Sequence, residues 1–205
     1  KSENHKRTFD NPELYDYCDV SQNNHQKGQS HWDNFQWVRN YISDHPRPIN
    51  TVKTYGADTG DYGKTKDGIE RWWRHLIGGA ASVRFHRPTA GLGLTNITMN
   101  SLYAAREIEK IVKFWEIEPG NELLLNREEN EAYLASETGK NYVVFFPDVG
   151  ETGIDLSAYD SNFSLKWMNV RNGTWTEEKE IKGGTVITLT TPGENEWVAV
   201  VTIKR

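Results

Sequence analysis

Three clusters of polar and aromatic residues hold the side chains best suited to chemistry in this sequence. Each cluster stands at the end of a segment that has the apolar, β-branched pattern of a buried strand. Amides, imidazoles, cationic groups and phenol rings are all present, so the clusters can donate hydrogen bonds and offer flat apolar faces. The clusters are Gln22-Asn23-Asn24-His25, then Lys53, Tyr55, Asp58 and Asp61, and finally Arg84, His86 and Arg87.

The position of the clusters predicts that they act together. In a parallel α/β sheet, ligands bind beyond the carboxyl ends of the strands, so the three clusters are expected to face one cleft. Their side chains hydrogen-bond to hydroxyl groups and stack on sugar rings, which suits a polyhydroxylated ligand. The residues expected to contact such a ligand are Asn24, His25, Lys53, Tyr55, Arg84, His86 and Arg87.

A structural role competes with each of these assignments. Residues 22–25 also read as a polar loop, and Lys53 as a buried lysine that has a partner. Asp58, within "GADTGD", is a candidate catalytic carboxylate or a turn former. Alternation along the strand places Arg84 and His86 on one face, where inward polar groups need partners.

The sequence indicates no metal site and no cofactor. Asp58 and Asp61 are followed by no complete calcium-loop pattern. "GLGL" lacks the third glycine and the strand–helix context of a dinucleotide fingerprint, and no P-loop or zinc motif is present. The lone cysteine, Cys18, excludes an internal disulfide and reads as a small core residue.

The first half of the chain alternates strands with helices. Strands are expected at 14–22, 48–56 and 80–86, and helices at 31–45, 65–80 and 95–116. Strands separated in this way are usually parallel. The pattern fits either a small open sheet or the last three βα units of a (β/α)8 barrel. On the second helix, the sequence predicts a solvated face with an ion pair between Glu70 and Arg74; that face comprises Glu70, Arg71, Arg74 and His75.

The second half has a different pattern. Short strands about ten residues apart are separated by turn signals such as "RNGT" and "TPGENE", which is typical of an antiparallel β-sandwich. Trp167, Trp175 and Trp197 are expected in its core or on a sheet face. The overall fold class is therefore α/β plus all-β, with domains at residues 1–118 and 119–205.

Composition excludes several kinds of partner. The net charge of −5 argues against nucleic acid, which requires a basic surface, and gives no support for binding an anionic membrane. No apolar run approaches the roughly 20 residues of a membrane span, so no membrane insertion is expected.

Several segments together resemble the end of apiosidase-like glycoside hydrolases. They include "GGAASVRFHRPTAGLGL", "AAREIEKIVKFWEIEPGNELL" and "NREENEAYLASETGKNYVVFFPDVGETGIDLS". The resemblance implies a (β/α)8 barrel followed by a small β-sandwich that is labelled a collagen-binding domain. It also implies a carbohydrate substrate, a secreted or cell-surface location, and an N-terminal part that supplies the remainder of the barrel.

The sequence departs from the family where catalysis is expected. On the strand that the resemblance makes the seventh of the barrel, Lys53 occupies the position of the carboxylate nucleophile. A retaining glycosidase needs two carboxyl groups about 5 Å apart, and the acid/base residue belongs to an earlier strand. Asp58 is the nearest substitute carboxylate.

Three hypotheses follow. The first is the C-terminal portion of a glycoside hydrolase-like protein, inactive as this fragment because a partial barrel lacks half of the site. The alternative is a non-catalytic glycan-binding or scaffold protein with a degenerate site. The third is a self-contained open α/β domain with an appended sandwich, which bare strand edges disfavour.

Overall fold

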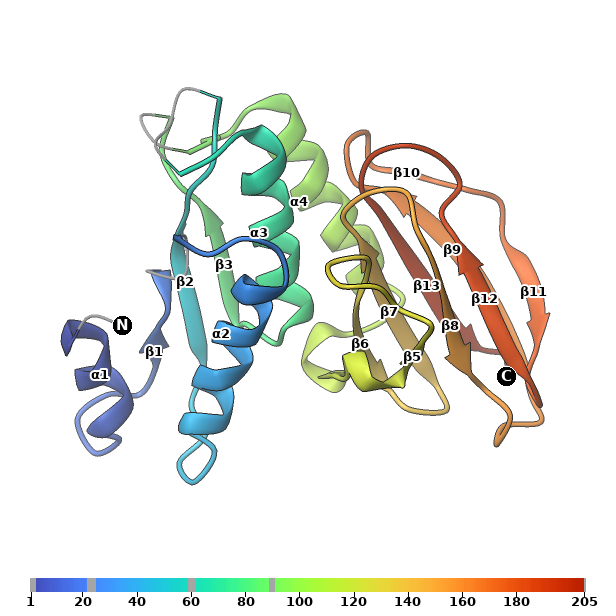
Figure 1. Ribbon diagram of the computed structural model, residues 1–205, viewed down its shortest axis with the longest axis horizontal. Coiled ribbons are helices and arrows are strands. Elements are labelled where there is room, and N and C mark those ends of the chain that lie inside the picture. Colours follow the sequence, from blue (N-terminus) through green and yellow to red (C-terminus); the bar gives the residue numbers. More distant parts are fainter. Residues whose placement is uncertain (1–2, 22–24, 59–61, 89–90, 205) are drawn as a thin grey trace. The chain divides into compact units, whose positions relative to one another are not determined.

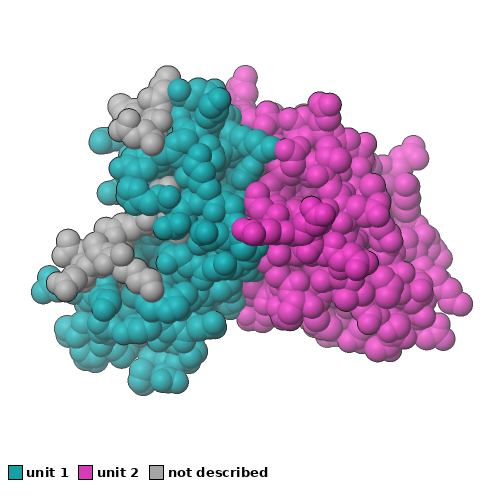
Figure 2. All heavy atoms as spheres, viewed as in Figure 1, with its two compact units in different colours: residues 1–95 teal, residues 96–205 magenta. Residues whose placement is uncertain are grey.

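The chain folds into two compact units. The computed structural model describes residues 3–21, 25–58, 62–88 and 91–204. Contacts divide it into Lys1–Thr95 and Asn96–Arg205 (Figure 2). The sequence places the boundary between domains farther along, at residues 118 and 119, and that boundary stays a prediction.

The first unit is a parallel sheet with helices. Strand β2 lies in the middle, and β1 and β3 both pair with it in parallel, as expected for strands linked by helices (Figure 1). The first strand is shorter than predicted, and helix α1 was not predicted. The elements are α1 (Glu3–Asp10), β1 (Cys18–Asp19), α2 (Gly28–Tyr41), β2 (Ile49–Thr54), α3 (Thr65–Ile77) and β3 (Ser82–Phe85).

Helices α2 and α3 cover one face of this sheet. Phe35 and Val38 of α2 pack in one core cluster with Cys18 and Ile49 of the strands. The ring of Trp72 on α3 stacks on Phe85 of β3, with centroids 5.3 Å apart and planes 9° apart. Cys18 is fully buried, which confirms its predicted place in the core.

The second unit is mostly antiparallel sheet. One path of strands runs β10-β9-β13-β7-β6-β4, with β11 also paired to β9, and a separate sheet has the order β12-β8-β5. The elements are helix α4 (Asn96–Glu109), the 3-10 turns Phe114–Glu116 and Asn121–Leu123, and the strands β4 (Glu118–Pro119), β5 (Leu124–Leu125), β6 (Tyr133–Glu137), β7 (Asn141–Phe146), β8 (Glu151–Asp155), β9 (Asn162–Asn169), β10 (Thr174–Trp175), β11 (Lys179–Lys182), β12 (Val186–Thr190) and β13 (Trp197–Ile203).

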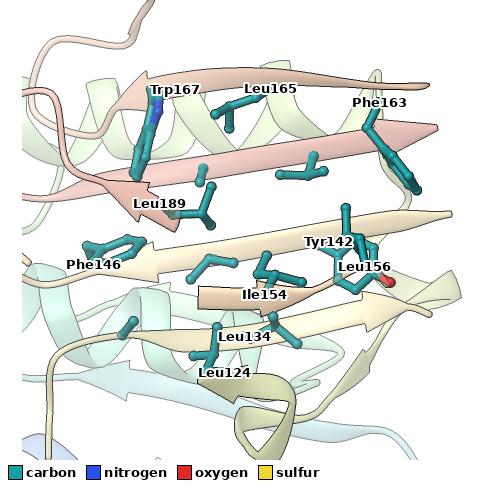
Figure 3. Close-up of a cluster of buried hydrophobic side chains, with 14 residues drawn as sticks. Leu124, Leu134, Tyr142, Phe146, Ile154, Leu156, Phe163, Leu165, Trp167 and Leu189 are labelled. Atoms are coloured by element: carbon teal, nitrogen blue, oxygen red, sulfur yellow. The ribbon is translucent and has the colours of Figure 1, made fainter. Parts of the chain in front are cut away.

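One apolar core is shared by the two sheets of the second unit. Figure 3 shows side chains of β7 and β9 gathered with Ile154 of β8 and Leu189 of β12. Burial of each large aliphatic side chain stabilises the fold by about 1.5–3 kcal/mol. Trp167 belongs to this core, as predicted, while Trp197 packs against it and stays partly exposed.

The predicted helix over 95–116 ends early. Helix α4 stops at Glu109, and the backbone N–H groups of Ile111 and Val112 both donate to the carbonyl of Ile108. Trp115, expected on the apolar stripe, is 70% exposed in a 3-10 turn. No glycine or proline marks the stop, and the turn lets the chain bury Val112 and Ile117. None of the described helices is long and apolar enough to cross a membrane.

Candidate functional site

Two predicted site residues meet where β2 and β3 end. Thr54 pairs with Phe85 in the sheet, and the backbone N–H of His86 donates to the carbonyl of Thr54 at 3.0 Å. This pairing brings Tyr55 and His86, the next residues on their chains, side by side. Their ring centroids lie 4.5 Å apart.

The contact extends into a row of rings. Tyr62 lies against Tyr55 with centroids 4.5 Å apart, and His25 meets Tyr62 edge-on at 5.1 Å. We call His25, Tyr62, Tyr55 and His86 the aromatic row. The structure thus joins three predicted residues from three loops. Tyr62 also belongs to the row. It was not predicted, because the sequence gives no sign that its ring lies against Tyr55.

A buried arginine fixes two of the three loops that carry the row. Arg71 on α3 is only 1% exposed, and its guanidinium donates to the carbonyls of Gln26, Tyr55 and Tyr62 at 3.0, 3.2 and 2.6 Å. Two of these carbonyls belong to residues of the row, and the third belongs to the neighbour of His25. One side chain therefore holds the loops after β1 and β2 against the helix.

Two glycines allow the loop after β2 to approach α3 closely. Gly56 has a φ of +120°, and a Cβ placed there would lie 2.5 Å from the backbone nitrogen of Gly68. A Cβ on Gly68 would in turn lie 2.5 Å from the carbonyl oxygen of Gly56. Glycine is required on both sides, because any side chain would push Tyr55 and its loop away from the helix.

Cations surround His86. Lys53, Arg84 and Arg87 are exposed, whereas His86 is only 8% exposed. Burial lowers the pKa of the His86 imidazole, and the positive charges of Arg87, Lys53 and Arg84 lower that pKa further. His86 is therefore a neutral imidazole at neutral pH, able both to donate and to accept a hydrogen bond.

Asp58 is bound to the start of a helix. Its exposed carboxylate accepts a hydrogen bond of 3.0 Å from the backbone N–H of Thr65, the first residue of α3. That bond holds the pKa of Asp58 below its usual value. The contact matches the turn-forming role that competes with catalysis. Asn24 and Asp61 lie outside the described residues.

The predicted solvated face of α3 is wrong. The ion pair is confirmed, since Arg74 Nη1 lies 2.9 Å from Glu70 Oε2. However, this side of the helix packs against α2, where His75 lies 4.3 Å from His31 and 5.0 Å from Phe35 between ring centroids. The exposed fractions of Glu70, Arg71, Arg74 and His75 are 9%, 1%, 1% and 0%.

Burial sets the charge state of the two histidines between α2 and α3. Burial, together with the positive charges of Arg74 and Arg71, lowers the pKa of His75 to about 3. The pKa of His31 is also lowered, by burial first and then by His75 and the two arginines. Both imidazoles are neutral at neutral pH. Across the described part of the chain, no group of three or more His, Cys, Asp or Glu residues could hold a metal ion.

One family model matches the C-terminal part of this chain. Residues 119–202 match the family model described as "Putative collagen-binding domain of a collagenase". A comparison with curated proteins finds no match.

The whole chain is similar in fold to solved glycoside hydrolases. One structure, described as "Glycoside hydrolase", has a TM-score of 0.71 at 13% identity, and the matched region covers 95% of this chain and 54% of the chain of that structure. A glycoside hydrolase family 5 protein from Bacteroides vulgatus has a TM-score of 0.67 at 14% identity, and the match covers 95% of this chain and 52% of the other. A noncanonic maltogenic α-amylase from Thermotoga neapolitana has a TM-score of 0.57 at 11% identity, and the match covers 94% of this chain and 52% of the other. The chain thus spans about half the length of each of these structures.

Proposed function

We propose that this chain is the C-terminal portion of a glycoside hydrolase-like protein that acts on poly- or oligosaccharides. In this proposal, residues 1–118 supply the last three βα units of a (β/α)8 barrel, and residues 119–205 form an antiparallel β-sandwich. The parallel order β1-β2-β3 supports the first assignment, and so does the fold shared with half of each glycoside hydrolase. A secreted or cell-surface location is part of the same proposal.

The observation that carries the proposal is the aromatic row. Four rings from three strand-end loops lie in contact, and the active sites of (β/α)8 enzymes form at this end of the strands. Aromatic faces pack against the apolar C–H faces of sugar rings, while polar neighbours bind the hydroxyl groups. The proposed glycan-contacting residues are those predicted from the sequence, together with Tyr62.

Catalysis in the proposal requires residues beyond this chain. Glycosidic hydrolysis uses two carboxyl groups, about 5 Å apart in retaining enzymes and farther apart in inverting ones. Asp58 is the candidate within this chain, and its lowered pKa keeps it ionised, as a nucleophile or base must be. We infer that the 205 residues alone are inactive and that an N-terminal part supplies the acid.

A second candidate function is glycan binding without hydrolysis. Two observations favour it: Lys53 stands on the strand where the resemblance expects a nucleophile, and Asp58 is held by Thr65 at the start of α3. A site of this kind binds the glycan through the aromatic row and does not hydrolyse it.

Two measurements test these proposals. The first is affinity electrophoresis of the 205-residue chain through plant and microbial polysaccharides. Tyr55→Ala should weaken the retardation. Tyr41→Ala, which removes an exposed ring that lies against Trp37, should not. If the wild-type chain binds none of the polysaccharides, the glycan site is wrong.

The second measurement is hydrolysis by the longer protein that contains this chain. Loss of cleavage in Asp58→Asn, with cleavage kept in Asp33→Asn, would support a catalytic carboxylate in this loop. Asp33 is a suitable control because it is an exposed carboxylate bonded only locally, to Gln29. Cleavage that survives in Asp58→Asn would leave Asp58 a structural residue. Binding without cleavage would favour the second candidate function.

A further inference from the structure

Two guanidinium groups lie beside the aromatic row. Arg84 is exposed, and its Nε donates to the carbonyl of Val52 at 3.0 Å, which ties the guanidinium to the backbone of β2. Arg87 is exposed one residue beyond His86, and its guanidinium makes no ion pair or hydrogen bond with the described residues. Both lie within electrostatic range of His86, since their charges lower its pKa.

The described carboxylates near these loops are already engaged elsewhere. Asp58 accepts from the backbone of Thr65. Asp67 accepts from the backbone of Lys64 at 2.7 Å and pairs with Lys27 at 3.1 Å. No described carboxylate pairs with either arginine, so both guanidinium groups remain available as cationic donors at the ends of β2 and β3.

This balance of charge distinguishes classes of sugar. A neutral sugar presents hydroxyl groups, which are bound well by carboxylates and amides that accept their hydrogens. A uronate or a sulfated sugar presents an anionic oxygen group, whose geometry matches the fork of a guanidinium. Exposed arginines also create a positive potential that attracts anionic ligands, and salt screens that attraction.

We propose that the aromatic row binds a glycan that carries an anionic substituent, with the sugar ring on Tyr55 and the anionic group at Arg84 and Arg87. The substituent is the carboxylate of a uronic acid or a sulfate ester. This inference rests on the proposed glycan-binding function and adds the class of ligand to it.

The test compares matched pairs of glycans. Binding of the 205-residue chain is measured calorimetrically for polygalacturonate and its methyl ester, and for a sulfated galactan and its desulfated form. At least one anionic member should bind about tenfold more tightly than its neutral partner. Whether polygalacturonate or the sulfated galactan shows the preference distinguishes the carboxylate from the sulfate ester.

Variants test which residues cause the preference for the anionic glycan. Arg84→Gln combined with Arg87→Gln should remove the tenfold difference, because the anionic glycan should lose more affinity than its neutral partner. Arg106→Gln, which removes one exposed arginine of α4, is the control for losing a positive charge away from the row and should keep the preference. Tyr55→Ala should weaken binding of both members of a pair.

The outcomes separate this inference from the function on which it rests. Equal affinity for anionic and neutral glycans would overturn the inference and leave glycan binding intact. A preference that survives the double variant would overturn the assignment to Arg84 and Arg87. If the wild-type chain binds none of the four polymers, both the inference and the proposed glycan-binding function fail.

Discussion

Arg71 donates a hydrogen bond of 2.6 Å from its guanidinium to the backbone carbonyl of Tyr62. The same guanidinium reaches the carbonyls of Tyr55 and Gln26, so one buried side chain holds the backbone of two of the three loops that carry the aromatic row. Its position inside the protein is compatible with a charge because each of these partners is a dipole with its negative end toward the cation.

The first prediction concerns this arginine. Arg71→Met keeps the volume and removes the hydrogen bonds, leaving three part-buried carbonyl oxygens without that donor. Unfolding free energy should fall by about 3 kcal/mol or more, as measured by urea denaturation. Glycan affinity should also fall in the folded variant, since the rings lose their support.

Two further variants make that result specific. Arg106→Met removes an exposed arginine that pairs with Glu109, and should change stability by less than about 0.5 kcal/mol. Arg71→Lys should recover part of the stability but not the binding affinity, because an ammonium cannot span three carbonyls. A fully stable Arg71→Met would mean that the loops hold themselves in place.

The second prediction follows from the buried histidines between α2 and α3. The folded pKa of His75 is depressed to about 3, whereas in the unfolded chain it returns to its ordinary value of 6.5. Between these values the unfolded state binds the extra proton, so stability must fall as pH falls below about 6.5. The slope approaches about 1.4 kcal/mol per pH unit for one such group. Thermal melting from pH 7.5 to pH 4.5 measures it.

His75→Leu tests whether this histidine is responsible. The variant should flatten the dependence on pH below 6.5, while His45→Leu, an exposed histidine after α2, should leave it unchanged. His31 keeps part of the slope in the His75 variant, since burial lowers its pKa as well. An unchanged slope in His75→Leu would show that groups other than His75 set the acid sensitivity.

Most of the strands and the parallel arrangement could be predicted from the sequence, because apolar spacing and turn residues are local signals. The buried polar side of α3 could not. Arg71, Arg74 and His75 have the residue types of a solvated face, and only tertiary contacts bury them, such as those of Arg71 with the loops after β1 and β2 and of His75 with α2. The early end of α4 was missed for a similar reason, since tertiary burial of Val112 rather than a stop signal ends the helix.

For the candidate site, the sequence located most of the row and missed what links it. His25, Tyr55 and His86 follow from strand-end positions, which depend only on the order of elements. Tyr62 lies within a turn whose fold depends on Gly56, Gly68 and Arg71, residues far enough apart that no local pattern connects them. Contacts of this kind become visible only with the tertiary structure.

The third prediction tests Tyr62 as a binding residue. Tyr62→Ala removes the ring that bridges His25 and Tyr55, and each such aromatic contact contributes about 0.5–1.5 kcal/mol. Glycan affinity should fall by up to about tenfold, as measured by calorimetry. Tyr62→Phe keeps the ring and should retain most of the affinity. Equal binding by Tyr62→Ala and the wild type would exclude Tyr62 from the site.

The last prediction concerns an ion pair in the second unit. Glu196 is fully buried, and its two carboxylate oxygens lie 2.5 and 3.0 Å from Nε and Nη2 of Arg171. Arg171→Met leaves that charge buried without its partner, so the free energy of unfolding should fall by about 3–5 kcal/mol. Urea denaturation measures it. Adding Glu196→Gln should restore part of the loss, because the unpaired charge is then gone. A double variant less stable than Arg171→Met alone would show that Glu196 stabilises the second unit even without the arginine.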